Sequence, residues 1–462
     1  MRTTVLLPEL VIAGAGVGLF IAHRLGIVPR RLLSAFALVA ALAALGLELW
    51  LGAQVGMLFG GGWQQDRFSL FAKALLLLGL ATLVATGDWS SEALEEVLPL
   101  GFLAVFGGMV VASASNLVGV WAGVELAALS GVAAAGVLGS ETGLRLLRVS
   151  VLASALMTIG FAFLYAVTGA ATLSGLRATL VNEQLALPIV LISILTLSGL
   201  AVRFGLAPFG APTLEGGITL SPVGAGVLHG LVAGSAGLAL AKLLGALSGT
   251  SPAWSLWLGV LATLAIVVGG LRATAVRGPR ALISWLTVQQ VGWVAAGLAA
   301  HDGRGVAAAL FLLGPVVIAA TAGPMLAGGT DAAPLRLAGL GRREPARAAG
   351  LALVLLSLAG VPPLAGFFGE FTVAAELLRA GLSWVLACGL LGWLLSAVGV
   401  VQALRLMYLE ASPEEPRGQR PRRAAVWAPG ALVPAALMLA YGFFANPIHS
   451  LAVQGAAALG LR

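Results

Sequence analysis

Long apolar segments alternate with short polar connections along almost the whole chain. A membrane-spanning helix needs roughly 20 apolar residues, and about fourteen segments approach that length. They cover residues 5–25, 32–52, 68–87, 97–114, 117–138, 147–170, 186–206, 221–247, 254–273, 280–300, 304–326, 347–376, 382–408 and 426–446. The pattern predicts an all-α membrane protein with about fourteen transmembrane helices.

Proline and glycine interrupt two of these segments, the seventh and the twelfth. The first interruption runs from Leu206 to Pro212 and the second from Gly360 to Gly366. Such gaps in a bilayer persist only where they face protein or water. Because the two segments lie five helices apart, they have opposite orientations, which is typical of two inverted five-helix repeats that each contain a broken helix at a transport site. The alternative is a pair of ordinary proline kinks.

The repeats divide the chain into four expected parts. Residues 1–96 hold three helices, residues 97–250 form the first repeat (helices 4–8), and residues 251–409 form the second (helices 9–13). Residues 410–462 contain a polar connection and the last helix. No polar stretch is long enough to fold as a separate soluble domain.

Positive charge is concentrated in alternate connections. The odd-numbered connections hold seventeen of the 26 Lys and Arg residues, namely Arg24, Arg30, Arg31, Arg145, Arg148, Arg272, Arg277, Arg280, Arg336, Arg342, Arg343, Arg347, Arg405, Arg417, Arg420, Arg422 and Arg423. The even-numbered connections and the two ends hold Arg2, Arg67, Arg177, Arg304, Arg379 and Arg462. Because positive loops stay in the cytoplasm, we expect a multi-pass inner-membrane protein with both termini on the outer side. The other three cations, Lys73, Arg203 and Lys242, fall inside apolar segments, where charge is costly and usually functional.

Composition supports this class and excludes others. The chain is 59% hydrophobic and 10% charged, which no soluble domain of 462 residues resembles. The basic residues behind its net charge of +7 are concentrated in alternate connections, so we expect no nucleic-acid partner. We expect the apolar helices to contact lipid. The single cysteine, Cys388, excludes a disulfide framework, and the four histidines are too scattered to suggest a metal site. No phosphate-binding loop or dinucleotide fingerprint appears, and we expect no cofactor in this chain.

Several motifs, taken in chain order, resemble one known family. They are Leu6-Leu-Pro-Glu-Leu10, Asp66-Arg-Phe68-Ser-Leu-Phe71-Ala-Lys73, the stretch from Ala112 to Glu125, Glu141-Thr-Gly-Leu-Arg145, Leu164-Tyr-Ala-Val-Thr-Gly169, the stretch from Leu358 to Gly369, and Arg405-Leu-Met-Tyr408. The chain is similar to the antiporter-like membrane subunits of respiratory complex I, especially the N-type subunit. That family is also related to Mrp antiporters and membrane-bound hydrogenases. The resemblance implies a cofactor-free subunit of a bacterial NADH:quinone oxidoreductase, assembled beside other membrane-arm subunits.

The chain departs from the family pattern at several places, and three of them bear on the candidate proton path. A lysine in the seventh helix is replaced by Arg203, and the N-type lysine of the twelfth helix is replaced by Glu370, as in the hydrogenase relatives. His229 lies within about one residue of the place where the eighth helix of the family carries Lys or His. Arginine holds its proton firmly, so the replacement at Arg203 puts pumping by the ordinary lysine scheme in doubt.

Four residues form the candidate proton path. Glu125 lies in mid-span, where a carboxylate costs about 2.5–3.5 kcal/mol on insertion scales, and the family pairs this position with that of Arg203. His229 titrates near neutral pH, and Glu370 follows the second break by about two helical turns. The alternatives without a transport role are a structural ion pair for Glu125 and a packed side chain for His229. Lys73 is interpreted as a structural or inter-subunit contact and Lys242 as a helix-end anchor.

Three functions remain open from the sequence. The first is redox-driven proton translocation within a complex I-type assembly. The second is an Mrp-type cation/proton antiporter subunit, and the third is a non-pumping scaffold of a complex I-like or hydrogenase complex. The replacement of the seventh-helix lysine by Arg203 favours the third.

Overall fold

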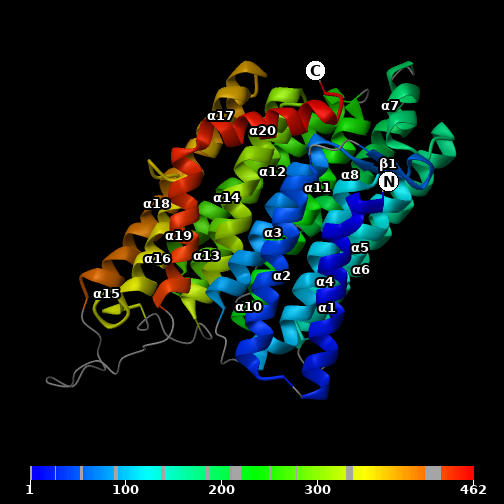
Figure 1. Ribbon diagram of the computed structural model, residues 1–462. Helices are drawn as coiled ribbons and strands as arrows, with labels where there is room; N and C mark the ends of the chain where they lie inside the picture. The colour runs from blue at the N-terminus through cyan, green and yellow to red at the C-terminus, as the bar shows by residue number, and fades with distance from the viewer. Residues whose placement is uncertain are drawn as a thin grey trace, which may run out of the picture.

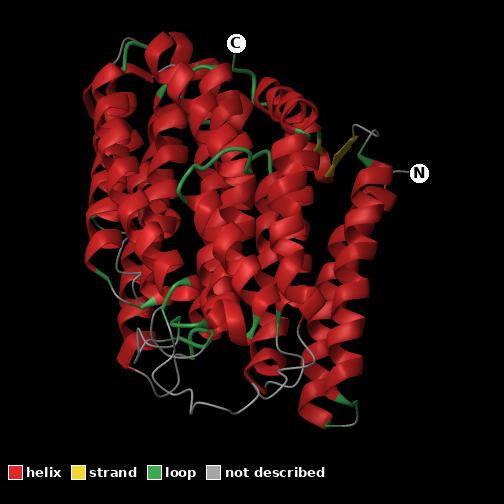
Figure 2. Cartoon of the chain, turned by 90° about the vertical axis from the view of Figure 1, so that its left-hand side faces the viewer, coloured by secondary structure: helices red, strands yellow, loops and turns green. Residues whose placement is uncertain are grey.

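A bundle of long helices makes up almost the entire described chain, which is known here from a computed structural model (Figures 1 and 2). The residues described are 3–26, 28–52, 56–87, 92–136, 141–182, 187–208, 210, 220–248, 251–276, 278–328, 337–410 and 428–461. The expected connection at 411–427 and most of the first break, including Pro212, therefore lie outside them. Both chain ends lie at one end of the bundle, and α15 lies at the opposite end (Figure 1).

The N-terminal part contains three long helices and a small hairpin. Its elements are η1 (Thr3–Leu6), α1 (Leu7–Leu25), α2 (Arg30–Leu51), β1 (Gly56–Leu58), η2 (Phe59–Gly61), β2 (Trp63–Gln65) and α3 (Arg67–Thr86). The two strands are antiparallel, with Gly56 opposite Gln65. Asp66 ends the hairpin and caps α3, because its side chain accepts a hydrogen bond from the Ser69 backbone amide at 2.8 Å. The turn thereby fixes the position of β2 over the first turns of α3.

The first five-helix segment runs from α4 to α11. Its elements are α4 (Glu92–Ser113), α5 (Leu117–Ala134), α6 (Glu141–Thr168), α7 (Leu173–Asn182), α8 (Leu187–Phe204), α10 (Pro222–Gly226), η3 (Val227–Val232) and α11 (Ala233–Ala246). The last three are continuous and form one span of 25 residues with a π-helical turn at η3. Single π-helical turns are rare and occur often at functional sites.

The second segment runs from α12 to α18. Its elements are α12 (Ser251–Ala275), α13 (Pro279–Ala299), α14 (Gly303–Ala327), α15 (Leu340–Arg343), α16 (Pro345–Leu358), α17 (Ala365–Arg379) and α18 (Ser383–Tyr408). The twelfth expected span is broken as the sequence indicates, with α16 and α17 separated by residues 359–364. Both breaks contain a cis X-Pro bond, Ala207–Pro208 in the first and Pro362–Pro363 in the second.

Equivalent helices of the two segments pack on equivalent partners. The helix α4 packs along α5 as α12 packs along α13, and α11 contacts α4 as α18 contacts α12. Likewise α8 packs on α6, and the two halves of the broken helix pack on α14. This arrangement is what two copies of one five-helix unit would give.

Twelve helices of the described residues are long and apolar enough to cross a membrane. The broken α16–α17 pair and the final helix α19 (Ala428–Phe443) account for the two other expected spans. The chain does not end there, because α20 (Ala445–Ala458) leaves α19 at 81° and lies across the end of the bundle (Figure 1). The hydrophobic pattern of the sequence did not predict α20.

Three spans form the centre of the bundle. The spans Pro222–Ala246, Pro279–Ala299 and Gly303–Ala327 are buried over the whole of their most apolar windows, whereas α6 and α18 are largely exposed. Exposed apolar helices suit contact with lipid or other membrane helices. A buried polar side chain on the central spans has no access to water at the surface, so it must find its partners inside the protein.

Candidate functional site

Glu125 of α5 and Arg203 of α8 form an ion pair inside the bundle. The Nη2 atom of Arg203 donates a hydrogen bond to Glu125 Oε1 at 2.8 Å, and the side chains are 3% and 14% exposed. Ser154 of α6 joins them, because its hydroxyl donates to Glu125 Oε2 at 2.9 Å and also contacts Arg203 Nη2. The pairing expected from the sequence is therefore confirmed, and Ser154 is a third member that sequence reasoning missed.

Arg203 and the π-helical turn line a common cavity. A small cavity of about 30 Å³ is lined by Arg203, Ser150 and the two η3 residues Leu228 and Val232, among others. About 10–15 Å³ is enough to hold one water molecule if polar partners are present. The Nε and Nη1 atoms of Arg203 are buried and donate no hydrogen bond to any of the described residues. The cavity therefore has room for water between the ion pair and η3.

His229 lies within this π-helical turn and is 1% exposed. A π-helical turn inserts one extra residue into a helix and turns the side chains that follow it. The structure places His229 on the central span Pro222–Ala246. Its role as a proton carrier remains a prediction.

Glu370 of α17 occupies a separate buried site beside the second break. It is 6% exposed, and its Oε1 accepts a hydrogen bond from Gln290 Nε2 of α13 at 2.5 Å. The same amide nitrogen donates to the Leu358 carbonyl at 2.6 Å, at the end of α16. Gln290 thus connects the carboxyl group to the broken end of the helix, a partner that the sequence did not reveal.

Gly360 makes this arrangement possible. It has φ +63°, a left-handed conformation that favours glycine, and a methyl group at its Cα would overlap Glu370 Oε2. Among the described residues no Lys or Arg forms an ion pair with Glu370, in contrast to Glu125. A buried carboxyl group without a cation is most stable when it carries its proton, so the two glutamates have different charge environments.

A second group of buried charges lies in the N-terminal three helices. Lys73 of α3 is 0% exposed, and its Nζ lies 2.5 Å from Glu9 Oε1 of α1 and 3.8 Å from Glu48 Oε2 of α2. The same Nζ donates to Gln65 Oε1 at 2.6 Å, and Gln65 Nε2 donates to Glu48 Oε1 at 2.6 Å. We call Glu9, Glu48, Gln65 and Lys73 the Lys73 cluster. A search of the apolar segments for carboxylates as well as cations would have found Glu48.

Lys242 of α11 corrects one expectation. It is not a surface anchor at a helix end but is 7% exposed, and it donates to the carbonyl groups of Val111 at 3.1 Å and Ala112 at 2.5 Å. Its ammonium also lies 5.3 Å from the centroid of the Phe68 ring. These carbonyls end α4, where the helix dipole favours a cation.

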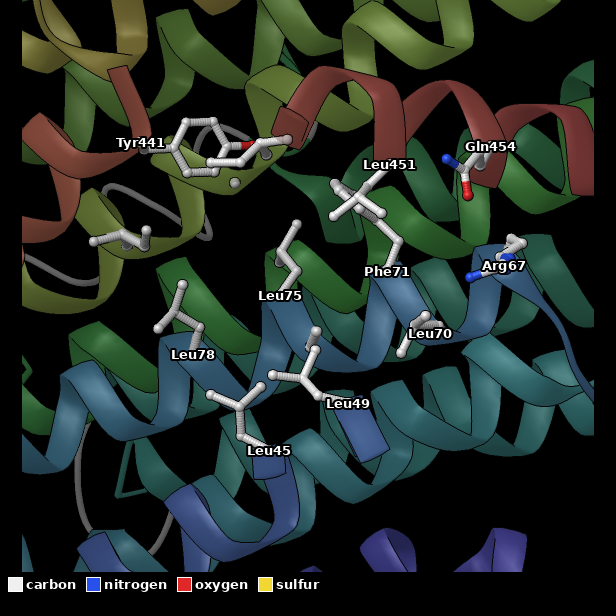
Figure 3. Close-up of a pocket in the computed structure, with 14 residues that line it drawn as sticks. Leu45, Leu49, Arg67, Leu70, Phe71, Leu75, Leu78, Tyr441, Leu451 and Gln454 are labelled. Atoms are coloured by element: carbon white, nitrogen blue, oxygen red, sulfur yellow. The ribbon is translucent and has the colours of Figure 1, made fainter. Parts of the chain in front are cut away.

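A large apolar cavity lies apart from all of these charges (Figure 3). Its volume is about 340 Å³, and it is lined by residues of α2, α3, α14, α19 and α20. Leu45, Leu49, Leu75 and Leu78 line the end shown at the left and below, while the polar Arg67 and Gln454 lie at the other end (Figure 3). The apolar lining gives a proton no groups to bind along most of its length.

Comparison with known proteins identifies the family. Residues 114–396 match the family described as "NADH:quinone oxidoreductase/Mrp antiporter, TM". The chain belongs to this family. The matched region contains Glu125, Arg203, His229 and Glu370.

Relatives named for one subunit match this family member over nearly its full length. The NADH-quinone oxidoreductase subunit N 2 of Syntrophobacter fumaroxidans is 30% identical, with 92% of both chains covered. The subunit N of Granulibacter bethesdensis is 29% identical, with 100% of both covered.

Solved structures share the fold of this family member. A chain of respiratory complex I from Thermus thermophilus, solved with bound aureothin, superposes with a TM-score of 0.81 at 25% identity. That match covers 97% of this chain and 100% of the other. A chain of the Mrp complex from Dietzia sp. has a TM-score of 0.80 at 20% identity, with 99% and 98% covered, which shows the fold alone.

Proposed function

We propose that this chain is the N-type membrane subunit of a bacterial complex I-type NADH:quinone oxidoreductase, in which it takes part in redox-driven proton translocation. Relatives named subunit N, similar along almost the entire chain, support the assignment to that assembly. The redox reaction would take place in other subunits, and this chain would bind no cofactor. Its partners would be the adjacent membrane-arm subunits, including other antiporter-like ones.

The proposal rests on one observation, which is that the buried carboxyl groups of Glu125 and Glu370 have different polar partners. Glu125 is held by a permanent cation, whereas Glu370 is buried beside a helix break, where its polar partner among the described residues is the Gln290 amide. An arginine stays charged, so Arg203 would act on protons by its field and not by accepting them. Glu370 and His229 can both gain and lose a proton, and they would carry it. His229 lies in the first five-helix segment, 97–250, and Glu370 lies in the second, 251–409. We propose that these two segments are inverted repeats.

A non-pumping scaffold is the second candidate. Arg203 favours it, because a residue that cannot release a proton occupies the place of a family lysine. The Mrp-type alternative has weaker support, since the similarity to the Dietzia chain, at 20% identity, concerns the fold.

We also propose that the protein lies in the bacterial inner membrane with both termini on the outer side. The excess of arginines in the odd-numbered connections supports this orientation. The connection between α1 and α2, with Arg24 and Arg30 beside it, and the basic helix α15 lie at the end of the bundle opposite the termini (Figure 1).

The test is the number of protons moved per electron in the assembled complex. Glu370→Ala should lower this ratio while NADH oxidation by the peripheral subunits continues, and Glu370→Asp should keep part of it because a titrating group survives. His229→Ala should give a similar loss that does not add to the first, since members of one relay act together. Glu96→Gln, at an exposed position of α4, is the matched control. An unchanged ratio in both Glu370→Ala and His229→Ala would establish the scaffold.

A further inference from the structure

The Lys73 cluster contains one more acidic group than basic group. Glu9 and Glu48 face a single ammonium, and the exposed fractions of the three side chains are 3%, 0% and 0%. Gln65, the fourth member, is neutral and is 1% exposed. If every group were ionised, the cluster would carry a net charge of −1 in a water-excluded part of the bundle, which is strongly unfavourable.

Among the described residues, three of the four carboxylate oxygens of the cluster accept no hydrogen bond. Lys73 is nearest to Glu9 Oε1, and Gln65 Nε2 donates to Glu48 Oε1. The oxygens without a hydrogen-bond donor in the described chain are Glu9 Oε1, Glu9 Oε2 and Glu48 Oε2, and of these Glu9 Oε1 is in ion-pair contact with the Lys73 ammonium at 2.5 Å. Glu48 Oε2 is 3.8 Å from Lys73 Nζ, beyond hydrogen-bond distance. By its distance from the Lys73 ammonium, Glu48 is the carboxyl group whose charge is less well compensated.

Neighbouring charges do not remove the excess. Asp66 and Lys242 are close enough to interact electrostatically with each other, and Lys242 also interacts with Lys73. Because Asp66 and Lys242 have opposite charges, including both of them leaves the net charge of the cluster unchanged. His23 and Arg30 pair with Glu95 at the far ends of α1 and α2, where they balance a different carboxylate. The Trp63 ring, 5.4 Å from Lys73 Nζ, adds no charge.

We propose that the Lys73 cluster is a proton-binding site that holds one exchangeable proton between Glu9 and Glu48, with Glu48 as its main carrier. Binding forms an O–H bond on a carboxylate oxygen and makes the cluster neutral. Release breaks that bond and passes the proton to water or another base, with no change of oxidation state. The site lies in the N-terminal three helices, outside both five-helix segments and outside the path proposed above.

The position of the cluster indicates where the proton is exchanged. Glu9 is near the start of α1, Glu48 near the end of α2 and Lys73 near the start of α3, so the cluster lies toward the end of the bundle that carries both termini (Figure 1). The β1–β2 hairpin closes this end, and its Gln65 touches both Lys73 and Glu48. Movement of Gln65 would expose the carboxyl groups to that side, which is the outer side if the proposed orientation holds.

Infrared difference spectroscopy of the purified, assembled complex tests the proposal, because a protonated carboxyl group has its own carbonyl band, which shifts in D₂O. Glu48→Gln keeps the shape of the side chain and should remove one such band. Glu9→Gln should remove the same band, since Lys73 and Glu48 then balance and no proton is needed. Lys73→Met should add a second band, because two carboxyl groups are left without a cation. Glu96→Gln should leave the spectrum unchanged.

The outcomes separate the proposal from its alternatives. A band that persists in Glu9→Gln would belong to a carboxyl group that is merely buried, and would overturn the sharing of a proton. No change in either glutamine variant would overturn the site altogether. A band that disappears when sodium replaces choline in the buffer would assign the site to a metal cation instead. The proposed pumping function can fail without affecting these spectra, because they record the bound proton and not its transport.

Discussion

Arg203 holds Glu125 through a hydrogen bond of 2.8 Å between Nη2 and Oε1, although the two residues are 78 positions apart in the chain. The pair joins α5 to α8, and Ser154 connects both partners to α6. Nothing comparable holds Glu370, whose described polar partner is the amide of Gln290. Of these two buried carboxyl groups, Glu125 is held by a cation, whereas the described partner of Glu370 is a neutral amide.

Removal of Glu125 should destabilise the protein more than removal of an exposed carboxylate. Glu125→Gln leaves the buried guanidinium of Arg203 without its counter-charge, and breaking a buried pair in this way costs about 3–5 kcal/mol. Glu96→Gln should change stability by less than about 0.5 kcal/mol. Thermal unfolding in detergent and the yield of assembled complex measure the difference. Equal, small effects of the two changes would show that the pair contributes little.

Arg203→Lys should preserve the ion pair and restore a releasable proton. We expect the complex to assemble and its proton-to-electron ratio to equal or exceed that of the wild type, because lysine can change its protonation state when buried. Arg203→Met, which removes the charge, should reduce assembly. If Arg203→Lys behaves like Arg203→Met, the geometry of the guanidinium matters and its charge alone does not suffice.

Gly360→Ala should disturb Glu370, whereas Gly381→Ala should not. Both glycines have positive φ, +63° and +73°, so each substitution carries a backbone cost of about 1–2 kcal/mol. Only at Gly360 would the new methyl group meet the carboxyl group of Glu370 and the indole of Trp393, while Gly381 has open space around it. The overlap should add about 1–3 kcal/mol to the loss of stability. The proton-to-electron ratio should fall only for Gly360→Ala, and a matching fall for Gly381→Ala would mean that backbone strain, not the position of Glu370, is responsible.

Labelling of introduced cysteines tests the orientation. Cys388 is the only cysteine in the sequence, so Cys388→Ser gives a background without thiols. Ser450→Cys on α20 should react with a membrane-impermeant maleimide added to cells with a permeabilised outer membrane. Arg342→Cys on α15, which is also exposed, should react only after the inner membrane is opened. The reverse result would invert the proposed orientation.

The position of the break in the helix could be predicted from the sequence, but the side-chain contacts at the break could not. Pro362, Pro363 and the flanking glycines indicated the gap between α16 and α17, because proline cannot donate a backbone hydrogen bond and glycine permits positive φ. Which side chain would fill the gap could not be read from the chain. Gln290 reaches it from α13, 68 residues before Leu358. Gln290 reaches the break because α13 packs beside α16, and the local sequence does not encode this packing.

Hydrophobic length and loop charge determined the class of this protein, since the bilayer requires apolar helices of one approximate length and loops of one sign on one side. The motifs determined the pairing of Glu125 with Arg203. Only the tertiary structure decided that Lys242 is buried, that α20 lies across the bundle, and that Glu9 and Glu48 meet on Lys73. Each of these depends on where helices distant in sequence come together. A buried charge takes whatever partner that packing supplies, because no water is available to replace it.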